Sequence, residues 1–139
     1  MDRRRLGLWA TLIIAILVVV GMAAQVYLVA TFAFDSAGES GADAINTHTD
    51  LGKVVHLGYV LTFLAALVAM WPNWRATGWA FALAVLGTIQ AFLAGGDLSP
   101  GVHAFHGMLA AVVFVIAVVI VWRTYLAIRV TRDDTSYAT

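Results

Sequence analysis

The chain has 139 residues, of which 62% are hydrophobic and 12% charged, and its mean hydropathy is +0.89. Soluble domains have roughly 25% charged residues, so this composition argues against one. Eight basic and eight acidic residues give no net charge, so no nucleic-acid partner is expected. The absence of cysteine excludes disulfides, thiolate metal sites and cysteine nucleophiles.

Four long apolar segments predict an all-α integral membrane protein. They cover residues 6–34, 47–71, 76–95 and 100–126, and each reaches the ~20 residues that a helix needs to cross a bilayer. The first segment follows three arginines and resembles a secretory signal, but its apolar run is too long for one. We therefore predict a single domain, residues 1–139, that forms a four-helix transmembrane bundle.

The loops predict where the helices begin. Residues 35–46 are rich in Gly, Ser, Ala and Asp, which is typical of an irregular linker or a short surface helix. Thr47, with Asp50 three residues later, resembles a capping box that would start the second helix. Ser99 and Pro100 supply an N-cap and a proline at the first position of the fourth helix.

The placement of charge predicts the orientation in the membrane. Arginines lie before the first segment, in the short turn at residues 71–75, and after the fourth segment. The loops at residues 35–50 and 95–101 are acidic, and Lys53 is the only base near them. By the positive-inside bias, both termini should be cytoplasmic, and the polar tail after Arg132 should be frayed. A multi-pass protein of a prokaryotic plasma membrane is expected.

The sequence contains an internal repeat of a helical hairpin. Residues 25–30, near the outer end of the first segment, match residues 90–95, near the outer end of the third. The second and fourth segments both open with His-x-x-x-Gly, at residues 48–52 and 103–107. Two such hairpins would be related by a pseudo-two-fold axis along the membrane normal, so matched residues should lie at matched depth.

All histidines lie on the outer halves of the second and fourth segments: His48, His56, His103 and His106. Neutral imidazoles on facing helices of a four-helix bundle can hold a haem between them. Gly52 and Gly107 either leave room beside such a disc or allow close helix packing. This pattern predicts one haem b, because the spacings of eight and three residues between the histidines do not suit two.

The sequence leaves the ligand pair open. The repeat aligns His48 with His103, whereas depth counted from the inner tryptophans aligns His56 with His106. A mixed pair, His56 with His103, is a third alternative. We favour His103 on the fourth segment and keep both histidines of the second.

Three further polar residues are candidates for contact with the cofactor. Gln25 and Gln90 are amides within apolar segments, where they join helices by hydrogen bonds or orient a ligand imidazole. Lys53 either pairs with a haem propionate or extends to the membrane surface. No catalytic residue is predicted, because the spans contain no serine and the histidines lack metalloprotease spacing.

The repeated Gln-x-x-Leu-x-Ala/Gly motif, followed by a histidine-led span, resembles the hairpin unit of haem A synthase. That family has two four-helix halves with histidine pairs on their second and fourth helices, and this chain would cover one half. The chain is also similar to small four-helix membrane proteins of archaea and actinobacteria with His-x-x-x-Gly-x-x-x-His on helix 2 and His-x-x-x-Gly on helix 4. The matching residues here are His48, Gly52, His56, His103 and Gly107.

The resemblance has one informative departure. The reacting half of haem A synthase carries a Glu three residues before its helix 2 ligand, where this chain has Lys53 before His56 and Ile45 before His48. The family also often has an extracellular cysteine pair, which is absent here. The resemblance therefore implies the half that carries haem b as a cofactor.

The first hypothesis is a b-type cytochrome with one bis-His haem near the outer leaflet, for electron transfer or haem handling. Its partners would be the lipid bilayer and a quinone or respiratory redox protein, with a homo-oligomer left open. The second hypothesis is a cofactor-free accessory subunit of a larger membrane complex. A third is a histidine-lined site for copper or zinc at the outer face.

The predicted orientation can be tested by cysteine labelling, because the chain has no native cysteine. In intact cells, a membrane-impermeant maleimide should label Ser40→Cys, and it should label Thr135→Cys only after the membrane is permeabilised. Equal labelling of both positions from outside would contradict cytoplasmic termini.

Overall fold

The computed structural model of the chain describes residues 3–35, 37–95 and 99–136. This part of the chain forms four α-helices: α1 (Arg3–Phe34), α2 (Glu39–Met70), α3 (Trp74–Leu93) and α4 (Pro100–Ser136). All four are long and apolar enough to cross a membrane. The predicted all-helical class and the four candidate spans are therefore confirmed.

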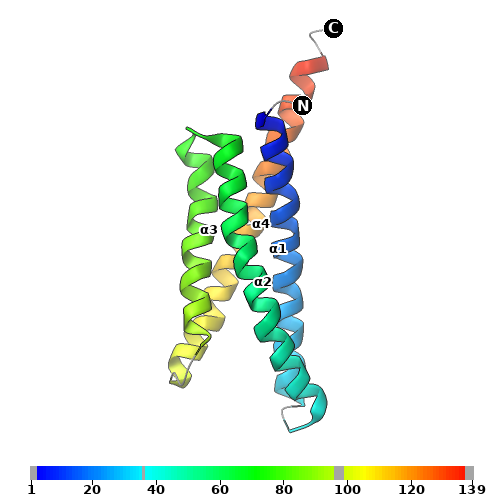
Figure 1. Ribbon diagram of the computed structural model, residues 1–139, viewed down its shortest axis with the longest axis vertical. Helices are drawn as coiled ribbons and strands as arrows, with labels where there is room; N and C mark the ends of the chain where they lie inside the picture. The colour runs from blue at the N-terminus through cyan, green and yellow to red at the C-terminus, as the bar shows by residue number, and fades with distance from the viewer. Residues whose placement is uncertain (1–2, 36, 96–98, 137–139) are drawn as a thin grey trace.

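The helices are arranged in chain order around the bundle. Each helix contacts its two neighbours, so the contacting pairs are α1 with α2, α2 with α3, α3 with α4 and α1 with α4. In the diagonal pairs, α1 with α3 and α2 with α4, no Cα atoms of described residues come within 8 Å of each other. The hairpins α1–α2 and α3–α4 diverge toward the end opposite the termini (Figure 1). The histidine-bearing helices α2 and α4 thus lie on opposite corners of the bundle.

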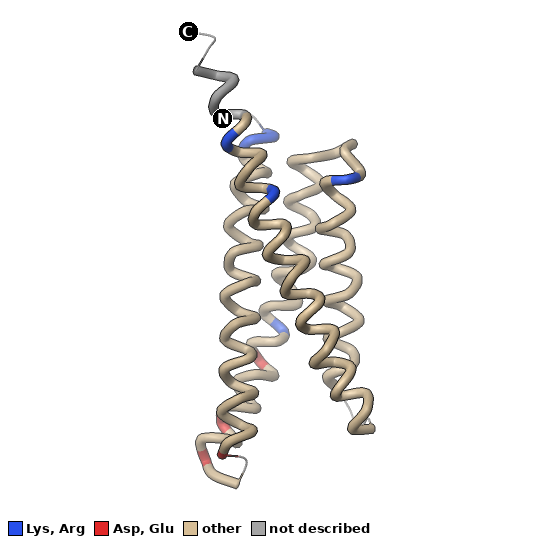
Figure 2. The backbone as a smooth tube through the Cα atoms, turned by 180° about the vertical axis from the view of Figure 1, so that it is seen from behind, with Lys and Arg blue, Asp and Glu red and all other residues tan. Residues whose placement is uncertain are grey.

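Charged residues separate between the two ends of the bundle. Arginines lie at the end where α1 begins and α4 ends, and the acidic residues of α2 lie near the other end (Figure 2). Lys53 lies with these acids, and its Nζ atom is 2.7 Å from Asp50 Oδ1. This distribution matches the charge pattern from which cytoplasmic termini are predicted.

Two helices are longer than the sequence predicts. α2 begins at Glu39 after an extended Gly38, so the linker expected at residues 35–46 is mostly part of a long helix. An acidic residue in the first turn and the alanines that follow favour this start. The expected capping box is wrong, because Thr47 and Asp50 lie inside the helix. α4 likewise continues to Ser136, where a frayed tail was expected, while Pro100 begins that helix as predicted.

Glycines bring α1 and α2 into close contact. A Cβ atom on Gly21 would lie 2.7 Å from Val55 Cγ2, and one on Gly58 would lie 2.6 Å from Val18 Cγ2. Both distances are shorter than carbon atoms tolerate, so a larger residue would separate the helices. Gly58 therefore serves helix packing.

A tyrosine and a glycine make the corresponding contact between α2 and α3. Tyr59 is only 4% exposed, and a Cβ atom on Gly87 would collide with its ring. The surrounding core contains small and medium apolar side chains from all four helices, including Ala15, Ala66, Leu83, Val113 and Ala117. This core occupies the middle of the bundle and leaves the histidines toward the end where the hairpins diverge.

The Gly87 contact predicts a difference between two alanine substitutions in α3. Gly87→Ala should destabilise the bundle by about 1–3 kcal/mol through overpacking against Tyr59. Gly78→Ala is the matched control, because no atom lies within 4 Å of its added Cβ, and alanine favours a helix by up to ~1 kcal/mol over glycine. Thermal unfolding in detergent micelles measures both. Equal stability of the two variants would contradict the packing assigned to Gly87.

Candidate functional site

Two histidines make the same hydrogen bond in the two hairpins. His48 Nδ1 on α2 is 3.3 Å from the backbone oxygen of Gln25 on α1, and His106 Nδ1 on α4 is 2.9 Å from the backbone oxygen of Gln90 on α3. The carbonyl can only accept, so each Nδ1 carries the proton and donates it. Each Nε2 atom is then left unprotonated, with a lone pair for a ligand.

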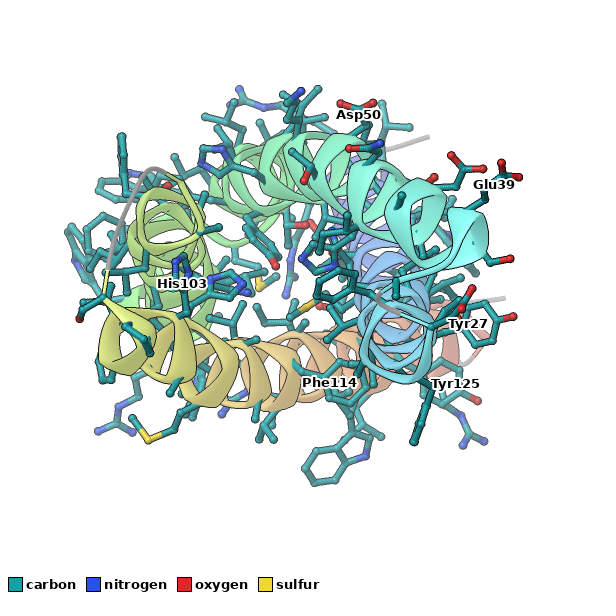
Figure 3. The ribbon with its side chains drawn as sticks, turned by 90° about the horizontal axis from the view of Figure 1, so that it is seen from below. Tyr27, Glu39, Asp50, His103, Phe114 and Tyr125 are labelled. Carbon is teal, nitrogen blue, oxygen red and sulfur yellow. The ribbon has the colours of Figure 1, made fainter. Side chains whose placement is uncertain are left out.

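The two anchored imidazoles lie near each other. His48 and His106 are both half-buried, and they are close enough to interact electrostatically although their helices are diagonal. A view along the bundle from this end shows His103 on the inner side of the α4 ribbon (Figure 3). His103 therefore lies on the inner side of α4 although it is exposed, and His106 is held against α3 by its bond to Gln90.

The amide of Gln25 fills the space beside His48. In the orientation that satisfies both amide atoms, its nitrogen donates to the His48 backbone oxygen at 3.3 Å and its oxygen accepts from the Gly52 backbone nitrogen at 2.7 Å. The same nitrogen is 3.2 Å from His48 Nε2, to which it donates, and it also contacts Nδ1. A Cβ atom on Gly52 would lie 3.2 Å from this amide. Gly52 therefore makes room for Gln25, which joins α1 to α2.

The second hairpin is less filled. The Oε1 atom of Gln90 is buried and has no hydrogen-bond partner among the described residues. At Gly107, an added Cβ would meet no atom within 4 Å. A buried acceptor without a donor costs about 1–3 kcal/mol. The α3–α4 hairpin thus has an unsatisfied polar group and open space, where the first hairpin has a packed amide.

The other two histidines have different surroundings. His56 Nε2 is 3.0 Å from Thr88 Oγ1 on α3, and its ring centroid is 6.4 Å from that of Tyr59. His103 is exposed, and no hydrogen bond of its side chain occurs within the described part of the chain. His48 and His106 are therefore the two histidines with equivalent hydrogen bonds, a match that neither sequence alignment gave.

The remaining predicted site residues contribute less. Lys53 and Asp50 form an ion pair that is exposed to solvent. The charge of Lys53 therefore already has a partner within the chain. Within the described ranges, no three His, Cys, Asp or Glu side chains form a group that could hold a metal ion. Sequence reasoning missed Thr88, for which the only signal was a hydroxyl two residues before Gln90.

Comparison of the chain with protein-family models, curated proteins and solved structures finds no match. The resemblance to haem A synthase therefore stays a prediction, and the chemistry of the site is inferred from its own residues.

Proposed function

We propose that this protein is a b-type cytochrome of the membrane, in which His48 and His106 hold one haem b between α2 and α4. The supporting observation is the matched hydrogen bond from each Nδ1 atom to the backbone oxygen of Gln25 or Gln90. Metal-ligating histidines nearly always donate their second ring nitrogen to a carbonyl or carboxylate. Such a bond fixes the tautomer and the ring orientation. On α2 the Gln25 amide, which donates to His48 Nε2, would have to turn away for that atom to bind iron.

The surroundings of the two histidines suit a flat apolar group. Their helices are diagonal and do not touch, and the hairpins diverge toward this end (Figure 1). Gly107 is exposed, and an added Cβ there would meet no atom within 4 Å. A planar cofactor held between facing helices uses these features.

Bound haem would supply one-electron chemistry at its iron. His48 and His106 would fill both axial positions, which disfavours oxygen binding and favours electron transfer. The apolar side chains of the bundle exclude water, and so they tune the reduction potential. We infer that the site lies near the outer leaflet of a prokaryotic plasma membrane, where a quinone or a respiratory redox protein would exchange electrons with it, or where haem is handed on.

The proposed ligands predict specific spectral changes. The purified protein should show a Soret band and, when reduced, the α and β bands of low-spin haem b. His48→Ala and His106→Ala should each convert the six-coordinate low-spin spectrum into a five-coordinate high-spin one, because one axial ligand is lost. Optical and EPR spectra of the purified variants distinguish these states.

The matched control is His56→Ala, which removes a histidine from the same helix and should keep the low-spin spectrum. If all single His→Ala variants keep the wild-type spectrum, haem is held elsewhere. A wild-type protein that purifies without a Soret band, even from cells supplied with haem, would overturn the proposal and favour an accessory subunit without a cofactor.

Acid should release the haem. Iron binds the neutral imidazole, and protons compete with it for the Nε2 atoms, so binding weakens as the pH falls and is complete at neutral pH and above. The low-spin Soret band should therefore fall in a pH titration toward acid and recover on prompt neutralisation. A band that persists in acid long enough for complete buffer exchange would contradict ligation by two histidines.

A further inference from the structure

His103 occupies the open end of the proposed site. It lies in the first turn of α4, where its backbone nitrogen is 3.3 Å from the Ser99 backbone oxygen. It precedes His106 by three residues, which places the two on neighbouring positions of one helix face, with His103 about 4.5 Å nearer the helix start. Figure 3 shows His103 on the inner side of α4.

The two histidines of α4 differ in how firmly they are held. The imidazole of His106 is fixed by the backbone oxygen of Gln90 at 2.9 Å. The imidazole of His103 is exposed and makes no hydrogen bond within the described residues, so no such bond fixes its rotamer. A fixed imidazole suits a permanent axial ligand, because little conformational entropy is lost on binding. A free imidazole at the rim suits capture and release.

The geometry points to His103 as a transient ligand through which haem reaches and leaves the site at His106. This inference rests on the proposed function, and it assigns the chain a role in transferring haem b. The haem would come from the lipid or from a carrier protein. In both cases His103 would meet the same group, an iron porphyrin with an apolar edge. The two hairpins diverge toward this end (Figure 1), so haem would arrive there without unfolding either hairpin.

The transfer is a simple exchange of ligands. His103 would bind the iron as one ligand from the source leaves, a side chain of a carrier or a water molecule in the lipid, and His106 would then replace His103. His48 would replace the ligand on the other side, so that each bond to iron that forms is matched by one that breaks. No electron moves, and both imidazoles stay neutral. Because a transient ligand lowers the barrier in both directions, removing it should slow loading and release equally and leave the affinity unchanged.

Stopped-flow absorbance can measure both directions for the full-length protein in detergent micelles. Loading of the haem-free protein is followed in two arms, from haem dissolved in micelles and from a haem–albumin complex. Release is followed by transfer to an excess of a haem-free globin. His103→Ala should slow loading in at least one arm, and release as well, by roughly tenfold, which corresponds to about 1.4 kcal/mol of barrier.

Two variants control the experiment. Phe105→Ala removes another exposed side chain from the same turn and should keep the wild-type rates. His103→Met, which supplies a thioether that also binds haem iron, should restore part of the rate. Slowing in the albumin arm alone identifies a carrier protein as the source, and slowing in the micelle arm alone identifies haem in the lipid. Slowing in both arms shows that His103 acts on haem from either source.

Three results would overturn the inference. Unchanged rates in His103→Ala would exclude a transient role, and a high-spin equilibrium spectrum in that variant would make His103 a permanent ligand. In both cases the wild-type protein still shows its low-spin spectrum, so the proposed cytochrome survives. A wild-type protein without a Soret band overturns the cytochrome together with this inference.

Discussion

Close approach of helix backbones at small residues is the interaction on which this bundle depends. Lipid tails are as apolar as the side chains they would replace, so burial alone does not drive helices together in a bilayer. Gly7 approaches Ala69 so closely that an added Cβ would lie 3.0 Å from it, and Gly21 and Gly58 extend this contact along α1 and α2. The first hairpin is thereby a fixed unit, and the carbonyl of Gln25 can be held opposite His48.

Polar groups in this interior are otherwise satisfied close to where they arise. Thr11, Thr62 and Thr77 are fully or almost fully buried, and each hydroxyl donates to the carbonyl four residues earlier, at 2.8, 2.8 and 3.1 Å. Such local bonds remove the cost of a hydroxyl in an apolar environment. The Oε1 atom of Gln90 differs from these hydroxyls, because it is buried without a hydrogen-bond partner among the described residues. This difference supports a role for Gln90 in binding.

Hydropathy was sufficient to predict the helices and their number, because a membrane span has to be long, apolar and internally hydrogen-bonded. The start of α2 could not be found this way. Its first turns are polar and contain glycine, which sequence reasoning assigned to a linker, whereas the structure continues the helix back to Glu39. Hydropathy finds the apolar part of a helix, which lies in the bilayer. It does not find the polar turns by which the same helix continues beyond the bilayer.

The histidine pair illustrates a second limit. Aligning the His-x-x-x-Gly motifs paired His48 with His103, but the two hairpins differ in length beyond their glutamines. α1 continues to Phe34, well past Gln25, whereas α3 ends at Leu93, soon after Gln90. The anchored histidines consequently lie 23 residues after Gln25 and 16 after Gln90. Because the first hairpin is longer, the two histidines that bond to equivalent carbonyls do not stand at equivalent positions of the His-x-x-x-Gly motifs. The hydrogen bonds to Gln25 and Gln90 show this correspondence, and the sequence alignment does not.

The difference in length also gives the two anchored histidines different surroundings. On α2, the amide of Gln25 and the missing side chain of Gly52 form a closed contact around His48. On α4, His106 lies close to the start of a helix, next to open space at Gly107 and a second, exposed histidine. Movement at the site would meet less resistance on α4, because fewer packed contacts have to break there. A cofactor held between these helices would therefore exchange its ligand on α4 while His48 keeps its position.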